Sequence, residues 1–84
     1  MNFSVQIKAS AVKELKRITA GDRRRIIAAI DRLAARPYAG TVLKGEYSGL
    51  RRIRIGRYRV VYEVRDRQLL VLVVRIAHRR EAYR

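Results

Sequence analysis

The sequence predicts a small single domain, residues 1–84, of the α+β class, in which a helical hairpin packs on a largely antiparallel four-stranded sheet. Apolar residues recur at helical spacing from residue 11 to residue 36, and they alternate at strand spacing from residue 41 onward. The connections between the later strands are short, as they are in hairpins. The expected order of elements is β-α-α-β-β-β.

A short strand and two helices are expected in the first half of the chain. Apolar residues alternate with polar ones in the first strand, at Phe3, Val5 and Ile7. Ser10 is expected to cap a helix over residues 11–19. Gly21 and Asp22 would then end that helix and cap the next one, which covers residues 23–36 and stops before the single proline.

Three strands are expected in the second half, at residues 50–55, 58–64 and 69–77. The short segments between them indicate an antiparallel meander. The last of the three is apolar on both faces, which is typical of a strand with neighbours on both sides in a sheet.

The charge indicates a polyanionic partner. Lys and Arg number 21 against seven Asp and Glu, a formal net charge of +14 whose self-repulsion works against the compact state. Most of the cations are arginine, which suits bidentate phosphate contacts. A codon bias towards arginine would explain the choice of arginine over lysine, but it would not explain the scarcity of acids. We therefore expect nucleic acid or an acidic protein as partner.

Several classes of site and location are disfavoured by composition. The chain has no cysteine and a single histidine, and its acids are scattered, so neither a metal site nor a cofactor is expected. No apolar run approaches the roughly 20 residues of a membrane helix. The first residues are too short and polar for a signal sequence. The expectation is a cytoplasmic protein with no membrane partner.

The most informative stretch covers residues 51–59, where five arginines fall within nine residues and alternate with apolar side chains. In a strand, Arg52 and Arg54 would share one face, while Ile53 and Ile55 face the core. This pattern predicts a row of cations on a sheet that binds a polyanion. A merely solvated strand face is the alternative.

Cleavage of RNA without a metal ion is one chemistry that these residues allow. It needs a base for the ribose 2′-OH, positive charge on the phosphorane and an acid for the leaving 5′-oxygen. One surface is expected to hold four of the cations: Arg52, Arg54, Arg59 and Arg79. Tyr83 is the candidate base, because nearby guanidinium groups stabilise a phenolate. Basic strands more often bind nucleic acid than cut it, so binding alone stays an alternative.

Three stretches resemble the RelE family of the RelE/ParE superfamily, the toxins of type II toxin–antitoxin pairs. They are Leu-Lys-Gly at residues 43–45, residues 50–64 with the run Gly-Arg-Tyr-Arg-Val-Val-Tyr, and residues 74–83. The likeness covers nearly the whole chain and implies the RelE-like fold. It also implies a ribosome-dependent mRNA endonuclease that cuts the codon in the A site and leaves a 2′,3′-cyclic phosphate or a 3′-phosphate.

The resemblance implies a set of site residues. Arg59, Arg79 and Tyr83 would be catalytic, with Tyr83 as base and Arg79 as phosphate clamp or proton source. Arg80 would take the role of Arg79 if the register slips by one residue. The substrate-binding residues would be Arg51, Arg52, Arg54 and Arg80. The best-known members carry lysines where Arg52 and Arg54 stand, and arginine keeps the charge but cannot act as a base.

The implied partners are the ribosome with its mRNA and a cognate, RelB-like antitoxin whose acidic amphipathic segment covers the toxin. Binding of the toxin–antitoxin complex to its operator DNA is a further expectation. Two alternative functions stay open: a ParE-type toxin that inhibits DNA gyrase, and a non-catalytic RNA-binding or ribosome-binding module.

Overall fold

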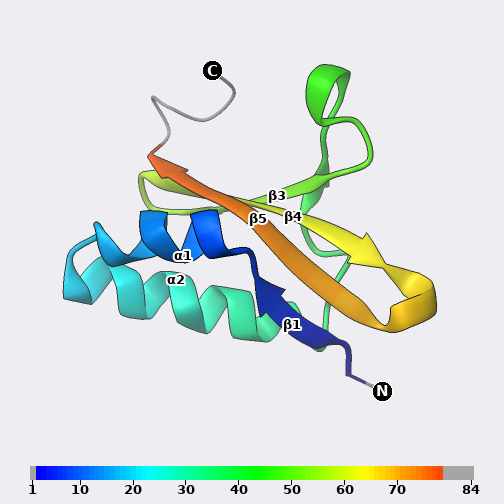
Figure 1. Cartoon of the computed structure of the whole chain (residues 1–84), viewed down its shortest axis with the longest axis horizontal. Helices are drawn as coiled ribbons and strands as arrows, with labels where there is room; N and C mark the ends of the chain where they lie inside the picture. Colours follow the sequence, from blue (N-terminus) through cyan, green and yellow to red (C-terminus); the bar gives the residue numbers. More distant parts are fainter. Residues whose placement is uncertain (1, 79–84) are drawn as a thin grey trace.

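The computed structural model describes residues 2–78 of the chain, in which two helices pack on one face of a five-stranded sheet (Figure 1). The predicted α+β class is confirmed. The elements are β1 (Ser4–Ile7), α1 (Ala9–Lys16), α2 (Ala20–Arg32), β2 (Thr41–Val42), β3 (Arg51–Ile55), β4 (Tyr58–Arg65) and β5 (Leu70–His78), with short 3₁₀ turns at Gly45–Tyr47 and Asp66–Gln68.

The sheet has the strand order β1-β5-β4-β3-β2, with β1 parallel to β5 and every other pair antiparallel. The four expected strands are all present, and β5 has neighbours on both sides as predicted. The fifth strand, β2, adds only two residues, Thr41 and Val42, beside β3. Two residues are too few to give an alternating pattern, which is why the sequence indicated four strands.

The helical hairpin is confirmed, but both helices begin and end earlier than expected. Lys8 is the N-cap of α1, so Ser10 lies inside the helix. Thr19 precedes α2, so Gly21 and Asp22 lie in its first turn. The Asp22 carboxylate accepts a hydrogen bond from the Thr19 hydroxyl at 3.4 Å, and a negative charge there complements the helix dipole. Neither helix within residues 2–78 has the length and apolar character needed to cross a membrane.

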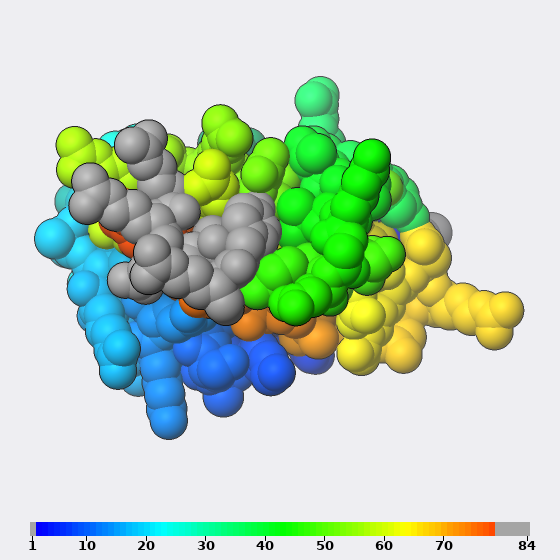
Figure 2. Space-filling view, turned by 90° about the horizontal axis from the view of Figure 1, so that it is seen from above, coloured from blue at the N-terminus to red at the C-terminus, as the bar shows by residue number. Residues whose placement is uncertain are grey.

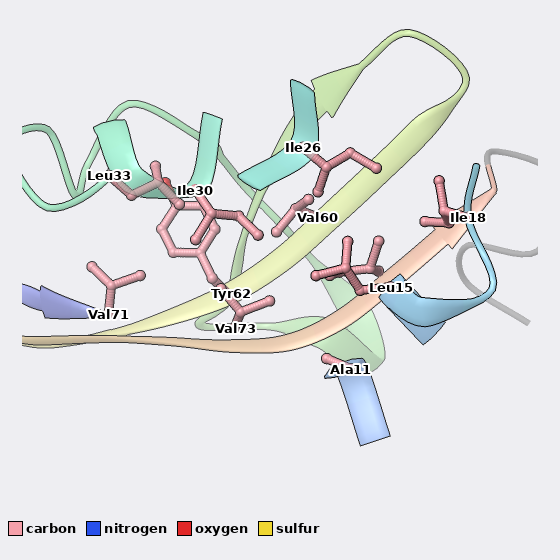
Figure 3. Packing of buried hydrophobic residues seen from close by; sticks show 11 residues of the cluster. Ala11, Leu15, Ile18, Ile26, Ile30, Leu33, Val60, Tyr62, Val71 and Val73 are labelled. Atoms are coloured by element: carbon pink, nitrogen blue, oxygen red, sulfur yellow. The ribbon is translucent and has the colours of Figure 1, made fainter. Parts of the chain in front are cut away.

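The core lies between the helices and the facing side of β4 and β5 (Figure 3). Side chains from the hairpin and from the two strands point toward one another there, and residues 2–78 bury no charged side chain. The cluster consists of Ala11, Leu15, Ile18, Ile26, Ile30, Leu33, Val60, Tyr62, Val71, Val73 and Ile76.

Tyr62 is the polar anchor of this core. Its ring is fully buried, and its hydroxyl donates to the Pro37 carbonyl and accepts from the Gly40 N–H, both at 2.9 Å. Burial raises the pKa of this phenol, although the Gly40 N–H and the charge of Arg51 act to lower it. The hydroxyl thus ties the segment between α2 and β2 to the centre of the sheet.

Arg51 strengthens the same connection from β3. Its Nη1 donates to the Gly40 carbonyl at 2.9 Å and to the Tyr38 carbonyl at 3.3 Å. The guanidinium also lies 5.1 Å from the centre of the Tyr38 ring, within cation–π range. Arg51 therefore holds the loop that carries Gly40 in place.

Replacing Gly40 with alanine should destabilise the fold. The new Cβ would lie 2.6 Å from the Tyr62 hydroxyl and 2.7 Å from the Arg52 carbonyl oxygen. Overpacking of this kind lowers the free energy of unfolding by about 1–3 kcal/mol. Urea unfolding followed by circular dichroism measures the change. Gly21→Ala is the matched control, because a Cβ at Gly21 meets nothing within 4 Å and a helical alanine should stabilise by about 0.5–1 kcal/mol. Equal stability of the two variants would contradict the steric account.

Arg51→Gln should also destabilise the protein, because two backbone carbonyls lose a charged donor and Tyr38 loses its cation. We expect a loss of about 1–3 kcal/mol in the free energy of unfolding. The control is Arg54→Gln on the same strand, whose side chain is exposed; it should stay within about 0.5 kcal/mol of wild type. If Arg51→Gln were as stable as Arg54→Gln, the bonds from Arg51 would not be holding the loop.

Candidate functional site

The face of the sheet turned away from the helices, here called the outer face, carries three of the predicted cations. Ile53 and Ile55 pack against the core cluster, so Arg52 and Arg54 point to the opposite side of β3. On β4, Val60 belongs to the core, and Arg59 therefore shares the outer face with them. Figure 2 views this side of the molecule, where side chains of β3 and β4 reach the surface.

The strand register brings these arginines close together. Arg54 stands directly opposite Arg59, and Arg52 stands opposite Val61, which is buried on the outer side of β4. Side chains in such positions have Cβ atoms about 5 Å apart. The side chain of Arg59 is partly buried, and its Nε atom is buried. The three cations thus form a cluster around an apolar centre.

A β-bulge adds a fourth cation that the sequence reasoning missed. Val61 pairs with Arg75 but Tyr62 pairs with Val73, so Val74 is an extra residue in β5. Strict alternation would place Arg75 on the same side as Val73, in the core. The bulge shifts the alternation, so that Arg75 faces outward and Ile76 packs in the core. No local signal marked the bulge, because residues 69–74 form an uninterrupted apolar run that hides any break in the alternation.

Arg51 does not join this cluster. Alternation along β3 puts it on the helix side with Ile53, where it contacts the loop that carries Tyr38 and Gly40. The structure therefore places this predicted substrate-binding residue on the opposite face from Arg52.

Three predicted site residues, Arg79, Arg80 and Tyr83, lie outside the described residues. The described chain ends at His78, whose ring makes an edge-to-face contact with Tyr58 at 5.6 Å between ring centres. Tyr58 also packs against the core cluster.

The outer face carries little negative charge. Glu63 shares the outer side of β4, and its carboxylate lies 2.6 Å from the Nε of Arg65 in an exposed ion pair. Within residues 2–78, no three acidic, histidine or cysteine side chains are grouped to hold a metal ion. The arrangement suits binding of a phosphate backbone, because three arginines occupy neighbouring positions on one face of β3 and β4.

A groove of about 520 Å³ lies between α2 and β3, at one edge of the outer face. Apolar residues from α2, the following loop and β3 line it together with four arginines. Arg32 is the last residue of α2, and Arg36 follows it about one turn later. Arg54 connects the groove to the outer face. The described lining contains no acid and consists of Arg25, Ala29, Arg32, Leu33, Arg36, Ala39, Ile53, Arg54, Ile55 and Gly56.

Comparison with known proteins identifies the fold and the family. Residues 5–83 match the family model described as the ParE toxin of the type II toxin–antitoxin system parDE. No curated protein matches the sequence.

Solved structures of similar shape include several RelE toxins. The toxin–antitoxin complex RelBE2 from Mycobacterium tuberculosis has a TM-score of 0.87 at 22% identity, covering 93% of this chain and 99% of that one. The archaeal RelE–RelB complex from Pyrococcus horikoshii OT3 has a TM-score of 0.78 at 30% identity and covers 98% and 100%. A mutant of Escherichia coli RelE, in complex with a peptide of its antitoxin, has a TM-score of 0.80 at 23% identity and covers 99% and 92%.

The family model names ParE and these three structures name RelE, and both lie within one superfamily. Because the family model spans nearly the whole chain, this protein belongs to the RelE/ParE superfamily of toxins from type II toxin–antitoxin systems.

Proposed function

We propose that the protein is a ribosome-dependent mRNA endonuclease that cuts A-site codons by attack of the ribose 2′-OH on the adjacent phosphate. The observation that carries this proposal is the arginine cluster on the outer face, formed by Arg52, Arg54 and Arg59. A sheet face that gathers guanidinium groups around a buried valine matches the charge of an RNA backbone.

The cluster would act by electrostatic stabilisation. When the 2′-oxygen attacks, the phosphorane gains negative charge on its non-bridging oxygens, and fixed cations stabilise it. Partial burial of Arg59 strengthens its field at the reacting phosphate. An arginine cannot take the 2′-OH proton, because its guanidinium group is already protonated and effectively keeps its proton in proteins. We assign the base to Tyr83, which takes the 2′-OH proton. We assign to Arg79, or to Arg80 in its place, the role of phosphate clamp or of proton source for the leaving 5′-oxygen.

Inhibition of DNA gyrase by binding is the second candidate function. It is favoured by the match of residues 5–83 to the ParE family model. The arginine cluster and the likeness to RelE structures favour the endonuclease instead. Because the two functions act on different targets, a single pair of assays separates them.

In a translation extract, the wild-type protein should produce codon-aligned breaks in mRNA, read by primer extension. Arg59→Gln should reduce the cleavage rate about 10²–10³-fold, the usual effect of losing a charge-stabilising donor. Arg79→Ala and Tyr83→Phe should abolish the breaks. The control is Arg67→Gln, which removes a cation from the turn between β4 and β5, away from the cluster. Intact mRNA together with inhibited supercoiling by gyrase would replace this proposal with the ParE-type function.

The groove between α2 and β3 is our proposed docking site for the antitoxin. Its apolar lining would accept one side of an amphipathic segment, and its four arginines would pair with acids on that segment. The relatives from M. tuberculosis and P. horikoshii are solved as complexes with an antitoxin. Because Arg54 belongs to both the groove and the cluster, an acidic segment seated there would also withdraw a cation from the outer face.

The double variant Arg32→Glu/Arg36→Glu should therefore weaken capture of the cognate antitoxin by at least about tenfold, since charge reversal adds repulsion to the lost contacts. Lys44→Glu/Arg67→Glu is the control for the change in net charge, because neither Lys44 nor Arg67 lines the groove. Titration of labelled antitoxin by fluorescence anisotropy measures both. If the two variants bind alike, the antitoxin docks elsewhere.

A further inference from the structure

The edge of β5 changes its partner halfway along the strand. The pairing with β1 ends where Ile7 meets Val73, and the remainder of this edge is covered by α1. There the Glu14 carboxylate takes the place of a neighbouring strand, because its Oε1 accepts the backbone N–H of Ile76 at 2.9 Å. Ile76 is the second residue after the bulge, so this bond holds the shifted part of β5.

The same carboxylate reaches Arg75. Its Oε2 lies 3.7 Å from the Nε of Arg75, and both side chains are about one-third exposed, at 29% and 33%. An ion pair as exposed as this contributes little to stability, typically about 0–1 kcal/mol. The pair instead fixes the direction of the Arg75 side chain at the border of the outer face.

The row across the sheet then reads Arg52, Val61, Arg75. The two arginines stand on either side of one buried valine, with Cβ atoms about 10 Å apart from two cross-strand steps of about 5 Å. In the neighbouring row, Arg54 and Arg59 are followed by Ala77, a small residue that is itself buried.

We propose that Arg75 is a fourth phosphate-binding arginine of the outer face, and that Glu14 is the positioning residue that holds it there through the bulge. The inference rests on one part of the proposed function, the binding of RNA by the outer face. It assigns the RNA path a direction, from β3 across β4 to the α1 side of β5. It also explains why a helix carboxylate is placed against a strand edge in a protein with few acids.

The test is the salt dependence of binding to a short labelled single-stranded RNA. Each lost phosphate contact lowers the slope of log K against log salt by about 0.7 for single strands. Arg75→Gln should lower the slope by that amount, as should Arg52→Gln, whereas Arg75→Lys should restore it. Arg67→Gln, on the distant turn, should leave it unchanged.

The role of Glu14 is tested by a conservative pair of variants. Glu14→Gln keeps an oxygen that accepts the Ile76 N–H, and should keep the wild-type slope. Glu14→Leu removes the acceptor, and should lower the slope as Arg75→Gln does while circular dichroism confirms a folded protein. In the double variant Glu14→Leu/Arg75→Gln, the slope should be no lower than in Arg75→Gln alone.

The outcomes separate this inference from the proposed function. A lower slope for Arg52→Gln with an unchanged slope for Arg75→Gln would overturn the role of Arg75 and leave the RNA-binding face in place. Unchanged slopes for both would overturn the RNA-binding face and the inference together. Equal slopes for Glu14→Gln and Glu14→Leu would remove the positioning role of Glu14.

Discussion

The hydroxyl of Tyr62 is the contact on which the arrangement of this protein depends. It lies in the core and bonds both to Pro37, within the segment after α2, and to Gly40, directly before β2. A buried hydroxyl without partners would cost free energy, so the core and the loop must form together. Through Gly40 and Arg51 the loop in turn supports β3, the strand that carries Arg52 and Arg54.

The outer face contains like charges that repel each other. Arg54 and Arg59 are directly opposite each other on neighbouring strands, and like charges in that position destabilise a sheet. The apolar side of the same strands offsets this cost by packing on the helices. A bound polyanion would offset the repulsion within such a pair, which is consistent with the proposed RNA substrate.

Much of the architecture was predictable because it follows from local periodicity. The helical hairpin, the order of the strands and the outward direction of Arg52, Arg54 and Arg59 all come from spacing along the chain. Alternation on β3 also determines that Arg51 faces the helices, although its charge suggested a place in the site. The starts of the helices were misplaced, because Ser10 and Asp22 are good capping residues that here lie inside the first turns.

The sequence by itself determined the fold class, the apolar face of each strand and a row of cations suited to a polyanion. Only the tertiary structure decided the place of β2, the bulge at Val74 and the contact of Glu14 with β5. The physical reason is the distance along the chain between the groups involved. Periodicity reports which face of an element is buried, whereas these features depend on groups that are distant in the sequence. Glu14 and Ile76 are 62 residues apart, and their hydrogen bond exists only after α1 has packed against β5.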